Sequence, residues 1–127
     1  MSDTVKIITT ANLDQIKNTA GIYLVDLWAT WCAPCKAMAP IIQTLSEDAD
    51  LQGVQFCKAD IDENPDIGDF FGVTSIPSFF LIQTKGDGTL DLTTDTLKKF
   101  VGTQSAFDFK TGILAQLDKL NITHIIA

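Results

Sequence analysis

The sequence predicts an α/β domain, in which helices cover both faces of a buried sheet. Three observations lead to this prediction. Short apolar runs alternate along the chain with segments whose apolar residues recur at helical spacing. The run over 22–28 is almost entirely apolar, as expected for a strand that is buried on both faces. The chain has 127 residues, of which 46% are hydrophobic and 20% charged, and this suits one ordinary domain with its own core.

The N-terminal part of the chain is expected to form an edge strand and a short helix. The edge strand is predicted over 5–8. Leu13 and Ile16 then lie at helical spacing behind Asn12, which is a residue type favoured at the N-cap position. Gly21 is expected to end this helix before the buried strand begins.

The buried strand over 22–28 leads into the longest predicted helix, from 33 to about 49. Met38 and Ile42 fall on one face of this helix. Pro40 lies inside it, where a proline removes a backbone hydrogen bond, and it is therefore expected to kink the helix.

The second half of the chain completes the order β-α-β-α-β-α-β-β-α, with about four helices in total. Pro65 suits the first turn of a short helix. Ser105 and Asp108 resemble a capping box, and Phe109 and Ile113 begin an apolar stripe on the closing helix. The elements expected here are a strand over 54–59, a helix over 64–71 that ends at Gly72, strands over 78–82 and 97–101, and a closing helix after 105.

Composition excludes several classes of function. The chain has nine basic residues, all of them Lys, against sixteen acidic ones, so its net charge is −7. An acidic chain without Arg is poorly suited to binding nucleic acid. The N-terminus shows no leader pattern, and no apolar run approaches the ~20 residues that span a bilayer. We therefore expect a cytoplasmic protein that binds neither nucleic acid nor membrane.

The most informative stretch is Trp31-Cys32-Ala33-Pro34-Cys35-Lys36, at the junction of the buried strand and the long helix. Two cysteines three residues apart on a first helical turn lie on one face and can form a disulfide. Unpaired N–H groups and the helix dipole favour a thiolate at the helix start, and the thiolate is the form that attacks disulfides. Cys32 therefore suits a first nucleophile, and Cys35, which is expected to be more shielded, suits a resolving thiol.

Two other interpretations of the cysteine pair stay open. The first is a zinc site, although zinc usually takes four Cys or His ligands and only Cys57 and His124 remain, at distant positions. The second is a pair of buried, inert cysteines, which the position at a strand–helix junction disfavours. Cys57 itself is expected to be a small buried residue of its strand.

From about Val5 to Leu120 the chain resembles thioredoxins. The resemblance implies the thioredoxin fold, with a central mixed five-stranded sheet between two layers of helices, as a single domain over 1–127. It also implies that the protein reduces protein disulfides. The matching pieces, in the family's order, are Asp26, Trp28, the stretch from Trp31 to Lys36, Pro40, Lys58, Asp60-Ile61-Asp62-Glu63-Asn64-Pro65, Phe71-Gly72-Val73, Ile76-Pro77 and Gly102.

The resemblance implies roles for four chemical groups. Cys32 is the nucleophile and Cys35 the resolving thiol. Asp26 lies between apolar neighbours in a central strand, where desolvation raises the pKa of a carboxylate. In the family this aspartate helps to move a proton to or from the resolving cysteine, near the lysine that Lys58 matches. The alternative for Asp26 and Lys58 is a buried ion pair with a purely structural role.

A docking surface for protein substrates is also implied. Ile76-Pro77 matches the family's cis-proline loop, which offers backbone groups to an extended substrate, and an ordinary trans turn is the alternative. Trp31 is expected to be exposed beside the thiols and Trp28 to lie beneath them, where a core role is equally open. The other residues assigned to this surface or its support are Ala33, Pro34, Gly72, Val73, Gly102 and, as a structural residue near the site, Pro40.

Three features depart from the family's pattern. Ala33 stands where Gly is more usual. The predicted turn over 84–95, which contains Gly86-Asp87-Gly88, is longer than the family's tight hairpin. Residues 121–127 extend past the usual end and are expected to pack on the body of the domain.

The sequence therefore predicts a monomeric thiol–disulfide oxidoreductase whose only redox group is its own disulfide, with no metal. Its expected partners are an NADPH-dependent thioredoxin reductase and proteins that contain disulfides. Two other classes stay open. One is a binding module with the same fold, which the intact cysteine pair disfavours. The other is a disulfide oxidase or isomerase, which would work in an oxidising compartment.

Overall fold

A mixed five-stranded sheet forms the centre of the computed structural model, which describes residues 4–119. The strand order is β1-β3-β2-β4-β5. β2 pairs in parallel with β3 on one side and antiparallel with β4 on the other. The predicted mixed sheet is therefore confirmed. The strands are β1 (Lys6–Ile7), β2 (Gly21–Trp28), β3 (Val54–Asp60), β4 (Ser78–Thr84) and β5 (Thr96–Val101).

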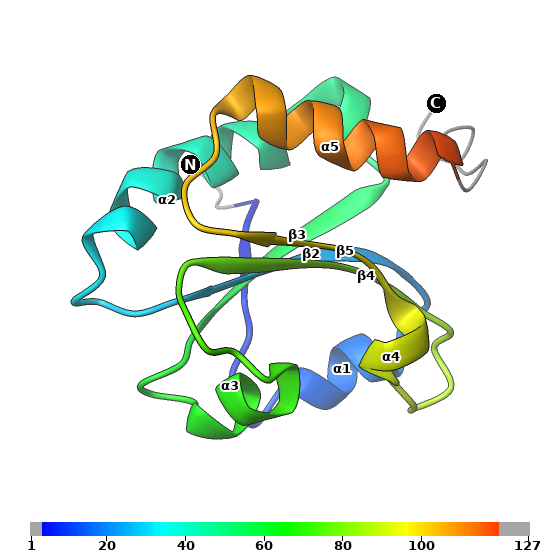
Figure 1. Ribbon diagram of the computed structural model, residues 1–127. Helices are drawn as coiled ribbons and strands as arrows, with labels where there is room; N and C mark the ends of the chain where they lie inside the picture. Colours follow the sequence, from blue (N-terminus) through cyan, green and yellow to red (C-terminus); the bar gives the residue numbers. More distant parts are fainter. Residues whose placement is uncertain (1–3, 120–127) are drawn as a thin grey trace.

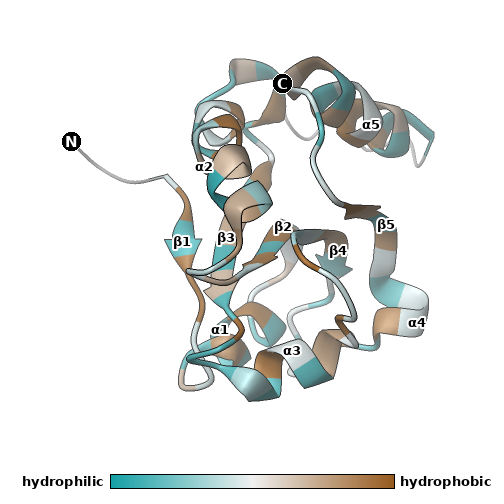
Figure 2. Ribbon diagram, turned by 60° about the vertical axis from the view of Figure 1, so that its left-hand side comes forward, coloured by the Kyte–Doolittle hydropathy of each residue, from teal (hydrophilic) through white to brown (hydrophobic). Residues whose placement is uncertain are grey.

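Helices cover the sheet on both faces. Figure 1 shows α2 and α5 on one face and α1, α3 and α4 on the other, so the predicted three-layer arrangement is confirmed. Figure 2 shows β1 at the edge of the sheet, beside β3. The helices are α1 (Leu13–Lys17), α2 (Ala33–Ser46), α3 (Pro65–Phe71), α4 (Leu92–Asp95) and α5 (Ala106–Lys119), with a short 3₁₀ helix at Ala49–Leu51.

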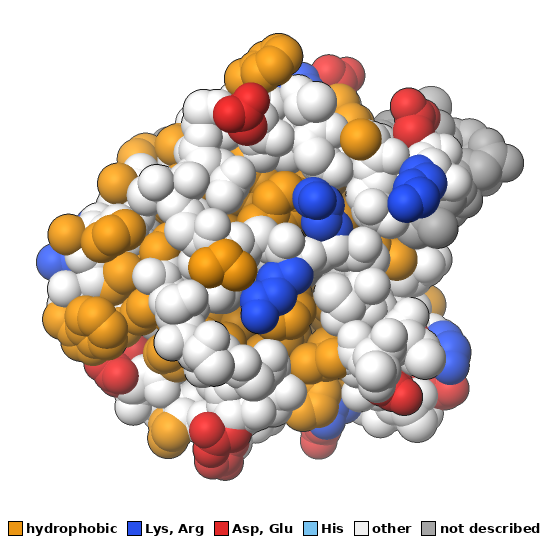
Figure 3. Space-filling model, viewed as in Figure 1, with side chains coloured by type: hydrophobic (Ala, Val, Ile, Leu, Met, Phe, Trp, Pro, Cys, Tyr) orange, Lys and Arg blue, Asp and Glu red, His pale blue; other side chains and the backbone are white. Residues whose placement is uncertain are grey.

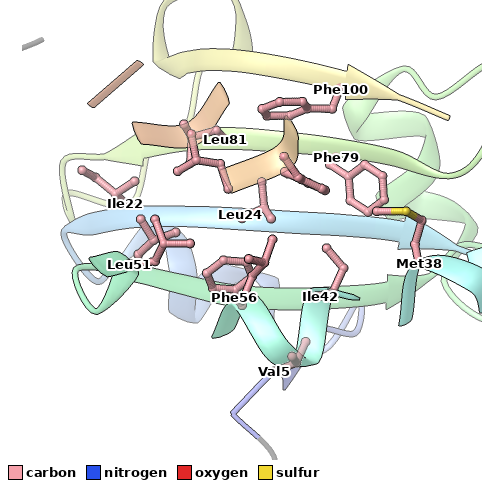
Figure 4. Close-up of a cluster of buried hydrophobic side chains, with 14 of the residues drawn as sticks. Val5, Ile22, Leu24, Met38, Ile42, Leu51, Phe56, Phe79, Leu81 and Phe100 are labelled. Carbon is pink, nitrogen blue, oxygen red and sulfur yellow. The ribbon is translucent and has the colours of Figure 1, made fainter. Parts of the chain in front are cut away.

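The pleat of β2 sends alternate side chains into two separate cores. Leu24 packs with Met38 and Ile42 of α2 in the core beneath α2 and α5 (Figure 4). Val25 packs instead with Ile67 of α3 in the core on the opposite face. This alternation has a period of two, so the side chain of Asp26 lies on the α2 face of the sheet.

The structure has five α-helices within residues 4–119, one more than the sequence patterns indicated. The missed helix, α4, lies inside the segment that was predicted as a long turn. Asp91 starts it: one carboxylate oxygen accepts a hydrogen bond from the backbone N–H of Thr93 at 3.0 Å. A helix of four residues is too short to show an apolar periodicity, so only its capping residue signalled it.

Two local predictions near the N-terminus need correction. β1 contains only Lys6–Ile7 rather than 5–8. Asn12 does not cap α1 through its side chain. Its carboxamide oxygen accepts a hydrogen bond from the N–H of Thr9 at 2.7 Å, and its amide donates to the carbonyl of Ile7 at 3.1 Å. The side chain is thus used to hold the turn that precedes the helix.

At the other end of the chain, one of the two bonds of the predicted capping box is confirmed. Ser105 Oγ accepts a hydrogen bond from the N–H of Asp108 at 3.0 Å at the start of α5. Leu120, where the resemblance ends, and residues 121–127, which were predicted to pack on the body of the domain, lie outside the described residues. No helix within the described part of the chain is long and apolar enough to cross a membrane.

Three aromatic rings join α5 to the sheet. The ring of Phe109 lies 4.9 Å from that of Phe79 and 4.6 Å from that of Phe100, between ring centres. Gly112 lies one turn beyond Phe109 on α5. A Cβ atom at Gly112 would lie 2.9 Å from Cε2 of Phe100, which is closer than real Cβ contacts. The glycine therefore lets the helix approach β5 closely.

We expect Gly112→Ala to lower the free energy of unfolding by about 1 kcal/mol. Alanine normally stabilises a helix interior relative to glycine by about 1 kcal/mol. Here overpacking against a buried ring is expected to cost more than that, roughly 1–3 kcal/mol. Urea denaturation measures the difference. Gly68→Ala in α3 is the matched control, because its Cβ would meet Ile61 at an ordinary 3.4 Å. Equal stabilisation by both substitutions would contradict the close approach.

Candidate active site

The two cysteines lie where β2 passes into α2. Cys32 occupies the N-cap position with an extended backbone, at φ −91° and ψ 103°. Its sulfur accepts a hydrogen bond from the N–H of Cys35 at 3.2 Å. Pro34 lies in the first turn, where a missing N–H group costs nothing. Cys32 and Cys35 form a disulfide with their Cα atoms 5.2 Å apart, as the predicted placement on one helical face requires.

The same geometry favours a thiolate on Cys32 once the disulfide is reduced. The N–H of Cys35 is already directed at the Cys32 sulfur. Free N–H groups and the positive end of the helix dipole stabilise a negative charge at this position. An activated thiolate is what nucleophilic attack on a disulfide requires.

The prediction that Cys35 is more shielded than Cys32 was wrong for this oxidised state. Each residue is only 3% exposed. The two cysteines pack with buried Ala29, and the partly buried side chains of Trp28 and Ile76 lie against them. Because the disulfide holds the two sulfurs side by side, they share the same covering side chains.

The loop before β4 closes over the disulfide and meets the end of β5. The Ile76–Pro77 peptide bond is cis, as the resemblance implied. Gly102 donates its N–H to the carbonyl of Pro77 at 2.9 Å. The φ of Gly102 is +84°, in the left-handed region that favours glycine. This bond therefore brings the predicted Gly102 beside the predicted proline loop.

A groove of about 320 Å³ runs beside this loop, and its lining includes Trp31, Val73 and Ile76. The structure therefore brings these three predicted residues together. Trp31 is 69% exposed, and its indole N–H donates to a carboxylate oxygen of Asp62 at 2.6 Å. In Figure 3, hydrophobic side chains gather at the left edge, over the β2–α2 turn and the start of α2.

Asp62 was expected only to belong to the stretch over 60–65 that matches the family, with no role of its own. Its side chain is exposed. The additional role as a hydrogen-bond acceptor for Trp31 links residues 31 positions apart, and no local pattern signals such a contact.

The other predicted surface residues have more peripheral positions. Ala33 and Pro34 are exposed on the first turn of α2. Gly72 ends α3 with a φ of +65° and does not line the groove. Pro40 is exposed, and α2 continues through it as a helix as far as Ser46.

A cavity of about 100 Å³ lies beneath the disulfide, and its lining includes Asp26, Trp28, Cys35 and Lys58. Asp26 is 5% exposed and lies opposite Lys58 in the parallel register of β2 and β3. One carboxylate oxygen of Asp26 and the indole N–H of Trp28 are both buried without a hydrogen-bond partner. Such groups are suited to bind water, and the cavity is large enough to hold it.

The Asp26 carboxyl has a pKa of about 7, raised from an ordinary 3.8. Desolvation by burial is the main cause, and the positive charge of Lys58 lowers the value by a smaller amount. Among the described residues, the ion pairs within 4.0 Å use Lys17 and Lys110 and none uses Lys58. This disfavours a tight structural ion pair. A carboxyl that is half protonated near pH 7 is suited to general acid–base chemistry.

Comparison with known proteins decides which family this arrangement represents. The thioredoxin family model matches residues 4–110. The chain belongs to the thioredoxin family.

Thioredoxins from several organisms are similar to this chain in sequence and structure. Listeria monocytogenes thioredoxin is 41% identical over 83 residues, which cover 65% of this chain and 78% of that protein. A Staphylococcus aureus thioredoxin is 42% identical over 77 residues, covering 60% and 71%. The structure of Trichomonas vaginalis thioredoxin superposes with a TM-score of 0.72 at 34% identity, covering 90% of this chain and 98% of that one.

A thioredoxin with a paired Cys32 and Cys35 is a protein thiol–disulfide oxidoreductase. The third cysteine of this thioredoxin, Cys57, lies apart from the pair. It is free, 1% exposed and packed in the core on the opposite face of the sheet. Burial raises the pKa of its thiol to about 12, so it is almost fully protonated at neutral pH. Within residues 4–119 no group of His, Cys, Asp or Glu side chains is placed to hold a metal ion.

Asp26→Asn is expected to stabilise the protein at pH 8 on the order of 4 kcal/mol. A carboxyl whose pKa is raised on folding stabilises the folded state less as the pH rises from about 4 to 7, because the unfolded chain ionises first. The gain from Asn should therefore disappear below about pH 4. Urea denaturation across this pH range measures it, with exposed Glu63→Gln as the control. A gain that does not depend on pH would contradict the raised pKa.

Proposed function

We propose that this protein is a general cytoplasmic reductant of protein disulfides, which an NADPH-dependent thioredoxin reductase returns to the dithiol form. One observation carries the proposal. The Cys32–Cys35 disulfide lies at the N-terminus of α2, with a groove of about 320 Å³ beside it and a titratable carboxyl beneath it.

The first step is attack by Cys32 on the substrate. In the reduced protein the Cys32 thiolate attacks one sulfur of a substrate disulfide. A mixed disulfide forms between Cys32 and that sulfur while the substrate's own S–S bond breaks. The other substrate sulfur leaves as a thiolate and takes a proton from solvent. The N–H of Cys35 supports this step because it stabilises the attacking anion.

The second step resolves the mixed disulfide. Asp26 accepts the proton of the Cys35 thiol through the cavity, and the Cys35 thiolate attacks the sulfur of Cys32. The mixed disulfide breaks, the substrate leaves as a second thiolate that is then protonated, and the Cys32–Cys35 disulfide forms. Two electrons have then passed to the substrate. Lys58 lies on the next strand, where its charge favours the ionised Asp26.

We assign substrate docking to the groove and the proline loop. An extended substrate segment can pair with the backbone at Ile76, in the manner of an added strand. Trp31, held by Asp62, supplies an apolar wall, and Val73 supplies another. The remaining members of this proposed surface are Ala33, Pro34, Gly72, Pro77 and Gly102, with Trp28 and Pro40 as its structural support.

The proposed chemistry needs no metal or organic cofactor. Thiol–disulfide exchange moves two electrons through sulfur alone, and the dithiol is the carrier. The reductase supplies the electrons, which originate from NADPH. A monomer suffices, because all the groups used in both steps come from one chain.

The decisive test is insulin reduction driven by NADPH and a thioredoxin reductase. We expect Cys32→Ser to lower the rate by at least about 100-fold, because the attacking sulfur is lost. Cys35→Ser should instead accumulate a mixed disulfide with the substrate, which is visible by mass spectrometry. Cys57→Ser is the matched control and should keep the wild-type rate, because this thiol is buried in the core on the other face of the sheet from the disulfide.

Two results would contradict the proposal. Activity that survives in Cys32→Ser would exclude the mechanism. A reduction potential near those of the oxidising disulfide isomerases, about −180 mV or higher, would favour the oxidase class. Fractionation of the source cells tests the cytoplasmic location separately.

A further inference from the structure

β5 is an edge strand of the sheet, and within residues 4–119 it pairs only with β4. Gly102 follows the strand and donates its N–H to the carbonyl of Pro77, on the β4 side. A trans peptide directs its C=O opposite to its N–H, so the carbonyl of Val101 points away from β4. Backbone groups alternate in direction along a strand, and those of Lys99 therefore point outward as well.

The contacts of Val101 agree with an accessible outer edge. Its carbonyl accepts a hydrogen bond at 3.3 Å from the side-chain amide of Gln104. This bond is exposed, so water competes for it and another backbone N–H can replace it. The side chain of Val101 is 50% exposed and offers an apolar contact beside these polar groups. The outer edge of β5 is therefore suited to pair with a further strand.

Two neighbouring lysines give this edge a positive charge. β5 contains Lys98 and Lys99 and no acidic residue, although the whole chain has a net charge of −7. The ammonium group of Lys98 lies 5.2 Å from the ring centre of Phe100, and that of Lys99 lies 5.3 Å from the ring centre of Phe80. These rings belong to opposite cores, so the two charges flank the strand on both faces of the sheet. In Figure 3, where β5 faces the viewer, lysine side chains lie near the middle of the surface.

The charges decide which kind of strand this edge can accept. Lysines on an edge strand hinder pairing between copies of a protein, because like charges would then lie opposite each other. The same lysines attract a strand that carries carboxylates. Since both ammonium groups lie back over rings of the sheet, they leave the backbone edge uncovered. A second copy of this chain is thus disfavoured, and an acidic strand is favoured.

The edge continues into the docking surface proposed above. β5 ends at Val101, and the next residue bonds to Pro77 of the loop that closes over the disulfide. An extended chain advances about 3.3 Å per residue, so Lys98 and Lys99 lie roughly three to four residues, or about 10–13 Å, from that loop. One extended substrate segment can therefore contact the loop and both lysines.

We propose that the outer edge of β5, from Lys98 to Val101, binds an extended acidic segment of a protein substrate as an added strand. We call this surface the β5 edge. The backbone of Lys99 and Val101 supplies the strand pairing, and the two lysines select carboxylates. The inference rests on the proposed reduction of protein disulfides, and it names a class of substrate: proteins with acidic residues on an extended segment a few residues from the reactive disulfide.

The test is an NMR titration of the oxidised, full-length protein with a synthetic peptide that lacks cysteine. The peptide carries two adjacent glutamates within a run of valine and threonine, so that one carboxylate reaches each face of the sheet. We expect the backbone amide signals of Lys99 and Val101 to shift on binding. A peptide with two glutamines in place of the glutamates should bind about threefold to tenfold more weakly, because each cross-strand charge pair contributes modestly.

Charge reversal separates recognition from a structural role of the lysines. In Lys98→Glu/Lys99→Glu the glutamate peptide should no longer bind, and a peptide with two lysines should bind instead. Lys6→Glu/Lys119→Glu changes the net charge equally at exposed positions outside β5, and it should keep the wild-type preference. If the reversed variant does not fold, Lys98→Gln/Lys99→Gln decides, because it should bind the glutamate and glutamine peptides equally.

A kinetic measurement connects the β5 edge with turnover. The substrate is a peptide disulfide that carries the acidic segment. Lys98→Glu/Lys99→Glu should raise its KM about threefold to tenfold and leave kcat unchanged, because binding is weakened and the chemical groups are untouched. The KM of the same substrate with glutamines should stay unchanged.

Three results would overturn the inference. The first is a titration with the glutamate peptide that leaves the amides of Lys99 and Val101 unshifted. The second is equal binding of the glutamate and glutamine peptides to the wild-type protein. The third is a shift of these amides with protein concentration alone, which would assign the β5 edge to a second copy. The titration requires no turnover, so a wild-type protein that fails to reduce insulin would refute the proposed function and leave the binding result interpretable.

Discussion

The burial of one carboxyl in the central strand is the constraint on which the site depends. β2 is fixed along both edges by β3 and β4, and its side chains pack into cores on both faces. Asp26 is therefore unable to turn toward solvent. The same strand ends at the turn that delivers Cys32 to the start of α2, so the strand that buries the carboxyl also places the disulfide above it.

The burial that suits Asp26 to acid–base chemistry also lowers the stability of the folded protein. A buried carboxyl without a hydrogen-bond partner on one oxygen destabilises the folded state whenever it is ionised. The same desolvation brings its pKa close to 7, where it can both accept and release a proton. Asp26 and Cys35 line the same cavity, which is suited to hold water. Proton transfer by the carboxyl is therefore confined to the site.

Parts of the chain that are distant in sequence meet around this carboxyl. Gln43 of α2 donates a hydrogen bond to Thr4, Trp31 donates one to Asp62, and Gly102 donates one to Pro77. Each contact is made by polar groups at the edge of an element, where they are free to bond across the fold. The site therefore forms where the ends of several strands and helices come together at the edge of a rigid sheet, which is typical of α/β proteins.

Local patterns in the sequence determined the five strands, four of the five helices, the cysteine pair at a helix start and the central carboxyl, because periodicity and capping act within a few residues. The resemblance added the cis-proline loop, which no local pattern specifies. Only the tertiary structure decided α4, the Trp31–Asp62 bond, the equal burial of Cys32 and Cys35, and the position of Val5 in the lining of the Asp26 cavity. Each of these features depends on groups from separate elements that come into contact only when the chain folds. No single segment of the sequence therefore predicts them.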